Sequence, residues 1–104
     1  MSNYNLSDNV NDSFEFQLRD KKYEMRYPTT QEIEDIQKLN RELEEATEAK
    51  DEARIERVNE LLEGALYGFI RPVDHETKIK KALRAENVRV LKNFNTMIRT
   101  ELSL

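Results

Sequence analysis

Residues 33–66 constrain the fold more than any other stretch, because they contain no proline and only one glycine, Gly64. Their apolar residues recur mostly at intervals of three or four, which keeps them on one face of a helix. These residues are Ile36, Leu39, Leu43, Ala46, Ala53, Ile55, Val58, Leu61, Leu62, Ala65 and Leu66. Most other positions hold Glu, Lys, Arg, Gln or Ala, which are good helix formers. The stretch therefore predicts helix and carries no catalytic signature.

The segment 46–54 decides whether this stretch forms one helix or two. Nothing in it stops a helix, yet the apolar stripe weakens to alanines there and changes phase. Either one long helix runs to Leu66, as in a dimeric coiled coil, or an antiparallel pair turns near Lys50 and Asp51. We favour the pair because so long a helix is unusual in a small domain. The expected helices span about 30–49 and 51–67.

Local capping signals fit these two helices. Thr29 followed by Glu32 matches a capping box at the start of the first helix. Asp51 is a good N-cap for the second helix, and Gly68 is a candidate C-cap. Pro72 then breaks the chain.

An antiparallel hairpin is predicted over residues 13–27. Phe14, Phe16 and Leu18 alternate with polar residues, and Tyr23, Met25 and Tyr27 do the same after a polar connection, residues 19–22, suited to a type I turn. A lone hairpin is only marginally stable, so its apolar face must pack on the helices. The aromatic residues are therefore expected in the core and not on a binding platform.

Two basic helices are expected after Pro72, over about 74–85 and 87–102. Asp74 is the expected N-cap of the first, His75 lies in its first turn, and the break near Glu86 and Asn87 is the weakest boundary. The whole pattern predicts a mostly helical α+β fold: an N-terminal antiparallel hairpin packed on a small bundle of three to four helices. Residues 13–104 form one domain, preceded by a flexible tail over residues 1–12.

Most catalytic chemistries lack their residues here. The chain has no cysteine, one histidine and two glycines, so it cannot supply a thiolate zinc site or a phosphate-cradling glycine loop. The paired acids sit in charge-rich helices and are expected to be solvated. We expect a protein that is not an enzyme and needs no cofactor or metal. No apolar run approaches the length of a membrane span and no secretory signal pattern is present, so we expect a cytoplasmic protein.

Charge is distributed unevenly along the chain. Residues 1–70 contain 17 acidic and 9 basic residues, whereas residues 71–104 contain 4 acidic and 8 basic ones. The simplest interpretation is that the basic C-terminal helices pack beside the acidic central ones. The alternatives are a complementary surface for another protein, or a nucleic-acid site, which the net charge of −4 disfavours. The basic residues of that site would be Lys78, Lys80, Lys81, Arg84, Arg89 and Lys92.

The last helix is the best candidate for binding a partner protein, because its apolar positions cover more than a narrow stripe. The candidate partner-binding residues are Val88, Leu91, Phe94, Met97, Ile98 and Leu102. A helix that is apolar over a broad face is also typical of the centre of a small core. Both interpretations hold together if the protein oligomerises.

The order of these features resembles the small tail assembly chaperones of long-tailed bacteriophages and prophages. A charged hairpin, FEFQLRDKKYEMRYPT, leads into a Glu- and Lys-rich helical body and the ending NVRVLKNFNTMIRTELSL. The resemblance covers residues 14–102 and includes no catalytic motif. It implies a non-catalytic role in the host cytoplasm, in which the protein coats the helix-rich tape measure protein and helps recruit tail tube protein. Family members often also exist in a longer, frameshifted form.

Two other functions remain open. One is a homodimeric coiled-coil interaction or regulatory protein with residues 36–66 as its seam, and the other is a nucleic-acid-binding regulator that uses the basic C-terminal helices. The first interpretation, protein binding without nucleic acid, membrane or small-molecule substrate, fits the residues best.

Overall fold

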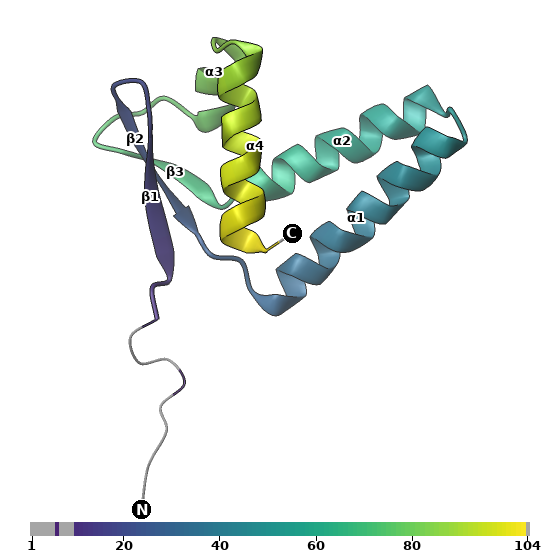
Figure 1. Ribbon diagram of the computed structural model, residues 1–104, viewed down its shortest axis with the longest axis horizontal. Helices are drawn as coiled ribbons and strands as arrows, with labels where there is room; N and C mark the ends of the chain where they lie inside the picture. The colour runs from purple at the N-terminus through teal and green to yellow at the C-terminus, as the bar shows by residue number, and fades with distance from the viewer. Residues whose placement is uncertain (1–5, 7–9, 104) are drawn as a thin grey trace, which may run out of the picture.

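The computed structural model describes Leu6 and residues 10–103, so most of the predicted tail lies outside the described residues. Seven elements follow along the chain: β1 (Ser13–Leu18), β2 (Lys21–Arg26), α1 (Thr30–Glu48), α2 (Glu52–Tyr67), β3 (Ile70–Val73), α3 (Ile79–Arg84) and α4 (Val88–Leu102) (Figure 1). The fold is α+β and mostly helical with an N-terminal antiparallel hairpin, as the sequence predicts.

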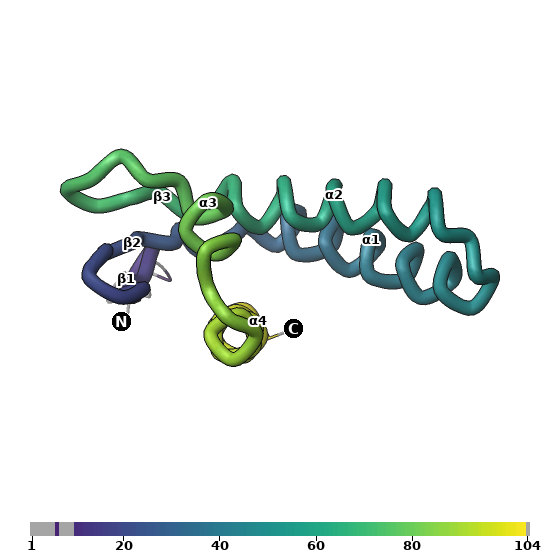
Figure 2. Tube along the Cα trace, turned by 90° about the horizontal axis from the view of Figure 1, so that it is seen from above, coloured from purple at the N-terminus to yellow at the C-terminus, as the bar shows by residue number. Residues whose placement is uncertain are grey.

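These elements form two parts, which we call the head and the arm. The head consists of the three strands with α3 and α4, and the arm is the helix pair α1–α2, which projects away from the sheet (Figure 2). The radius of gyration is 16.2 Å, whereas a compact domain of about 100 residues has one of about 13 Å. The protein is therefore elongated.

The arm begins and ends as its capping residues predict. The Thr29 hydroxyl accepts the Glu32 amide at 3.2 Å while the Glu32 carboxylate accepts the Thr29 amide at 2.9 Å. Lys50 adopts a left-handed φ of 54° between the helices, and Asp51 caps α2 by accepting the amide of Arg54. Two helices therefore form, not one.

The apolar seam of the arm, where α1 and α2 meet, is formed by packing of these two helices against each other in one molecule. Ile36 on α1 packs with Val58 and Leu62 on α2, and all three are buried. Ala46, which is fully buried, is small enough to let the helices approach near the tip of the arm. The continuous coiled-coil seam considered for residues 36–66 does not form, because the chain reverses in its middle.

The turn between β1 and β2 differs from the prediction. Leu18 pairs with Lys21, which leaves a two-residue loop in which Arg19 has a φ of 58°. A positive φ at the first loop position excludes the expected type I turn. Two-residue hairpin loops favour such geometry because it matches the right-handed twist of the strands.

The third strand, β3, was not predicted. It pairs antiparallel with β2, with Ile70 opposite Met25 and Pro72 opposite Tyr23, and completes a sheet in the order β1-β2-β3. Proline is tolerated in a strand at the edge of a sheet, so Pro72 does not end the structure here as the sequence suggested.

The predicted start of the third helix is wrong. Asp74 has a left-handed φ of 61° and caps nothing, and α3 begins at Ile79. The preceding loop is bonded to β2 instead: the Tyr23 hydroxyl donates to the Thr77 carbonyl at 2.9 Å. His75 accepts the Thr77 amide at Nδ1, so Nε2 carries the proton and donates to the Lys22 carbonyl at 2.8 Å. The expected break before the last helix is confirmed, since Asn87 caps α4.

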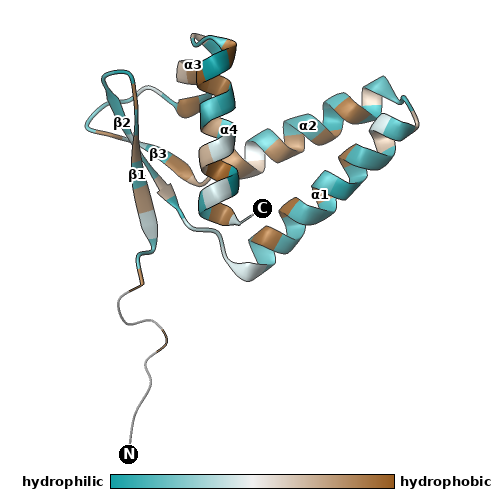
Figure 3. Ribbon diagram, in the orientation of Figure 1, coloured by the Kyte–Doolittle hydropathy of each residue, from teal (hydrophilic) through white to brown (hydrophobic). Residues whose placement is uncertain are grey.

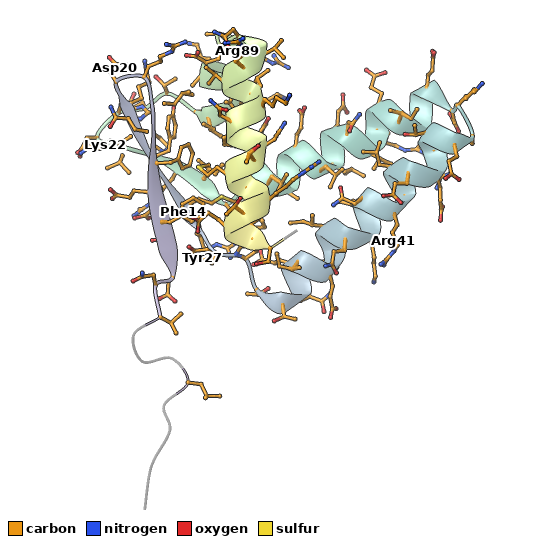
Figure 4. The ribbon with its side chains drawn as sticks, viewed as in Figure 1. Phe14, Asp20, Lys22, Tyr27, Arg41 and Arg89 are labelled. Carbon is orange, nitrogen blue, oxygen red and sulfur yellow. The ribbon has the colours of Figure 1, made fainter. Side chains whose placement is uncertain are left out.

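The core of the head lies between one face of the sheet and the helices α3 and α4. Its buried members are Tyr23, Met25, Ile79, Leu83, Phe94, Ile98 and Leu102. Phe16 lies between Tyr23 and Phe94, with ring centroids 5.6 and 5.9 Å away, and Phe14 and Tyr27 meet at 5.2 Å (Figure 4). The hairpin aromatics therefore pack around the core, as predicted.

Leu66 and Phe69 join the two parts, because they contact both the core of the head and that of the arm. Figure 3 shows that hydrophilic residues predominate along the arm, with hydrophobic residues interspersed on both of its helices. No helix in the described part of the chain is long and apolar enough to cross a bilayer.

Candidate partner-binding surface

The six residues predicted to bind a partner have different positions on α4. Phe94, Ile98 and Leu102 are at most 8% exposed and belong to the core of the head. Leu91 and Met97 are half-buried, and Val88 is 78% exposed in the first turn. The broad apolar face thus serves the core first, and only its flanks reach the surface.

One flank of α4 faces the arm across a groove. Two adjoining hollows of about 430 and 570 Å³ lie there, they share Asn59, Leu62, Leu66 and Asn95 in their lining, and we treat them together as one groove. We call it the arm groove. Its apolar lining includes Leu43, Leu62, Leu66, Leu91 and Ile98. Three amide side chains also line it: Asn40, Asn59 and Asn95.

Charges of both signs stand at the two ends of the arm groove. Lys80 and Arg84 of α3 share one end with Glu63, and Glu44 shares the other with Arg99. Among the described residues, no ion pair within 4.0 Å crosses the groove. The basic and acidic helices therefore face one another without closing the space between them.

Tyr67 lies at the α3 end of the arm groove. Its partial burial raises the pKa of the Tyr67 hydroxyl, the nearby Glu63 carboxylate raises that pKa further, and the Arg84 guanidinium lowers it. The hydroxyl consequently stays protonated at neutral pH and can donate a hydrogen bond to a ligand in the groove.

The other flank of α4 faces β1 across a second groove of about 420 Å³, which we call the strand groove. Its apolar lining is Phe16, Leu18, Val90, Phe94 and Met97, and its polar lining is Gln17, Arg19 and Asn93. Arg19 binds the Glu86 carboxylate with two nitrogens, at 3.0 and 2.8 Å. This pair lowers the pKa of Glu86 and ties the hairpin turn to the segment before α4.

Sequence reasoning missed the parts of both grooves that lie outside α4. The apolar positions of α2 spread beyond one narrow stripe, with Leu61 and Leu62 adjacent, and this excess was the available signal for the arm groove. No local signal places Leu18 and Val90 in the lining of one groove, because that arrangement depends on how the hairpin packs on α4.

The six basic residues proposed for nucleic acid are all exposed on α3, its N-cap and the first turns of α4. Arg89 marks this end of the molecule in Figure 4. Within the described ranges, no group of three or more His, Asp and Glu side chains is placed to hold a metal ion.

Comparison with known proteins gives no relative. No protein-family model matches the chain, and no curated protein or solved structure does so either.

Proposed function

We propose that this protein is a non-catalytic assembly chaperone that holds an amphipathic helix of a partner protein in the arm groove. The observation that supports this proposal is the groove itself, which lies between helices and is lined by leucines and by three amide side chains. Helices commonly bind by laying an apolar stripe into such a groove.

The polarity of the arm groove suits reversible binding. Leu43, Leu66 and Leu91 are only half-buried, so a bound helix would cover apolar surface that now meets water. The amides and end charges stay hydrated when the groove is empty, which keeps the free protein soluble. Such a surface can cover an apolar stripe during assembly and release it afterwards.

The resemblance to phage tail assembly chaperones identifies the proposed partner. A tape measure protein is long and helical and presents apolar stripes before the tail forms around it, and tail tube protein is the second proposed partner. The proposed role takes place in the host cytoplasm and involves no nucleic acid, membrane or small-molecule substrate.

Within the predicted set, the half-buried Leu91 lines the arm groove and is the proposed helix contact, whereas Ile98 borders the groove from the core of the head and is only 4% exposed. Met97 lines the strand groove and Phe94 borders both grooves, whereas Leu102 supports the core. Val88 is exposed at the start of α4.

Co-expression tests the proposal. The chain is produced alone and together with the long helical protein encoded beside it, and each preparation is analysed by size-exclusion chromatography with light scattering. We expect a stable complex that carries several copies of the chain per partner. A tight dimer that ignores the neighbour would contradict the proposal.

Groove variants locate the contact. Asn95→Arg places a long side chain in the arm groove from an exposed position, and Thr96→Arg adds the same charge on an outward position of α4 as a control. We expect the first variant to lose the complex and the second to retain it. If both variants bound the partner protein equally well, the binding site would not be the arm groove.

The two alternatives remain testable in the same preparations. The coiled-coil dimer would need a seam other than that of residues 36–66, because the arm uses Ile36, Val58 and Leu62 internally. The nucleic-acid regulator would bind DNA with a steep dependence on salt. Indifference to DNA at low salt would remove it.

A further inference from the structure

The two edges of the sheet differ in their capacity to accept another strand. Just before β3, the Phe69 carbonyl accepts the Arg26 amide at 2.9 Å, so the backbone of Arg26 faces β3. Along an antiparallel ladder, hydrogen-bonded pairs alternate with non-hydrogen-bonded pairs, so the pair of Tyr23 and Pro72 is of the second kind. The backbone nitrogen of Pro72 therefore faces away from β2. Proline lacks the N–H that an added strand would need, so this edge is blocked.

The edge of β1 is open. The Asp12 carbonyl accepts the Tyr27 amide at 2.8 Å. In the register of β1 and β2, the backbone N–H and C=O groups of the even-numbered residues of β1 therefore face β2. The N–H and C=O groups of Ser13, Glu15 and Gln17 consequently face outward. Within the described chain, β2 is the only strand that pairs with β1, and β1 contains no proline.

The strand groove runs along this open edge. Its lining includes four consecutive residues, from Phe16 to Arg19, and therefore reaches the backbone of β1 itself. A chain added beside β1 would direct every second side chain toward the same face as Phe16 and Leu18. Those side chains would enter the groove and contact Met97 and Val90.

Charge specifies what lies opposite Glu15. Glu15 pairs across the strands with Glu24, and Arg71 on β3 holds Glu24 at 2.7 Å. Glu15 is exposed and belongs to no ion pair within 4.0 Å among the described residues. A basic residue on an added strand would extend the alternating row Arg71, Glu24, Glu15. Symmetric pairing of two copies about Glu15 would instead oppose two carboxylates, which is unfavourable.

We propose that the open edge of β1 binds an extended segment of a partner protein as a fourth strand. The segment carries apolar side chains at alternate positions, which enter the strand groove, and a Lys or Arg opposite Glu15. This site lies on the opposite flank of α4 from the arm groove, so it does not depend on the proposed function.

A capped synthetic peptide, Thr-Val-Lys-Val-Thr-Val, serves as the probe in an NMR titration of the full chain up to millimolar concentration. We expect saturable shifts at the amides of Glu15 and Gln17, and slower hydrogen exchange at both, with little change at Arg71. Two control peptides have the same sequence but carry N-methyl groups on alternate amides, one on the odd-numbered amides and the other on the even-numbered amides. Each lacks one of the two sets of N–H groups that could bond to β1. The peptide that is methylated on the amides facing β1 must not bind.

Charge reversal tests the role of Glu15. Replacing the Lys of the peptide by Glu should weaken binding by about two- to fivefold, the size of a cross-strand charge pair. The Glu15→Lys protein should invert that preference. Gln17→Pro removes an outward amide without removing a bond to β2, and should abolish binding while leaving the circular dichroism spectrum unchanged.

Three outcomes would overturn the proposal. The first is no saturable shift at Glu15 and Gln17 at the highest peptide concentration. The second is binding that survives N-methylation in both registers. The third is protection of these amides in the free protein together with a dimeric mass, which would make a second copy the occupant. Since none of these readouts involves the helical neighbour, they fail or succeed separately from the proposed function.

Discussion

The arm and the head differ in how far apart in the sequence their contacts lie. The arm comes from one contiguous stretch, residues 30–67, with its caps inside or beside it and a seam formed by Ile36, Val58 and Leu62. The head is assembled from the hairpin, β3 and the last two helices. Its contacts cross long intervals of sequence, as between Tyr23 and Thr77. The arm therefore depends on local signals and the head on long-range ones.

The position of the arm in the chain connects the two parts. Arg26 ends β2 and Ile70 begins β3, and the whole arm lies between these adjacent strands. An antiparallel helix pair returns the chain to its starting point, so a folded arm shortens the effective loop that pairing of β3 must close. The arm thus makes the third strand of the head less costly in entropy. Four predictions test this division, from the largest expected effect to the smallest.

Met25→Ala removes a fully buried side chain from the core of the head. We expect it to lower the free energy of unfolding by about 2–5 kcal/mol, because a cavity remains where the side chain packed. Urea denaturation followed by circular dichroism gives the loss, and hydrogen exchange reports on each helix. Met25→Leu, which conserves volume, should cost less than about 1.5 kcal/mol. If α1 and α2 lose protection as fully as α4 does, the arm does not fold by itself.

Ala46→Leu overfills a site near the end of α1 where Ala46 is fully buried. We expect a cost of about 1–3 kcal/mol from displaced neighbours. Ala53→Leu adds the same atoms at an exposed position of α2 and should change stability by no more than about 0.5 kcal/mol. Calorimetry on both variants makes the comparison. Similar melting temperatures would show that the two helices separate easily at their tip.

Lys50→Gly relieves the left-handed backbone at the tip of the arm, where φ is 54°. We expect stabilisation of up to about 1 kcal/mol, because glycine adopts this conformation without a Cβ clash and loses part of the gain to its greater freedom when unfolded. Arg41→Gly, at an exposed position in the interior of α1, should instead destabilise by about 0.5–1 kcal/mol. Opposite signs in thermal denaturation would confirm the turn, and two losses would contradict it.

Glu32 gives the smallest expected effect and acts where the arm leaves the head. The Arg26 guanidinium, 2.8 Å away, and the Thr29 amide hold the pKa of Glu32 at about 2, below its ordinary 4.5. Because the pKa is lower in the folded protein, this stabilisation is complete above pH 4.5 and is lost as the pH falls toward 2.

The measurement is the stability of wild type and Glu32→Gln at several pH values. The wild type should be more stable than Glu32→Gln at pH 7, and the difference in their free energies of unfolding should shrink between pH 5 and pH 2. Glu34→Gln, at an exposed position on the same helix, is the control for the loss of one acidic side chain. If the difference in free energy of unfolding between the two proteins did not change with pH, the charge of the Glu32 carboxylate would contribute nothing to stability.

The sequence predicted the arm well because its determinants are local. Thr29 with Glu32, and Asp51, are caps that act on amides within three residues, and they function as expected. The head was predicted less completely. Asp74 has the pattern of a helix cap, but the bonds of Tyr23 and His75 to distant backbone atoms hold the loop in another conformation. Such competition between local and long-range bonds is invisible in the sequence.

The third strand and the grooves could not be predicted for a related reason. Ile70–Val73 is short, contains Pro72 and lacks clean alternation, so its pairing depends on the exposed edge of β2. For α4, periodicity identified Phe94 and Ile98 as members of one apolar face. It could not decide which members face the core, because that depends on where the sheet and the arm lie.

The proline in β3 also bears on how many molecules can associate through their sheets. A monomer with one binding edge can end a row of associated molecules but cannot lengthen it, as a monofunctional monomer does in polymer chemistry. In the described part of the chain, Pro72 lies on one edge of the sheet and β1 forms the other, so this sheet has a single end for strand pairing. Even two molecules joined through β1 would present proline at both outer edges. Edge-to-edge pairing through this sheet therefore stops at a pair of molecules.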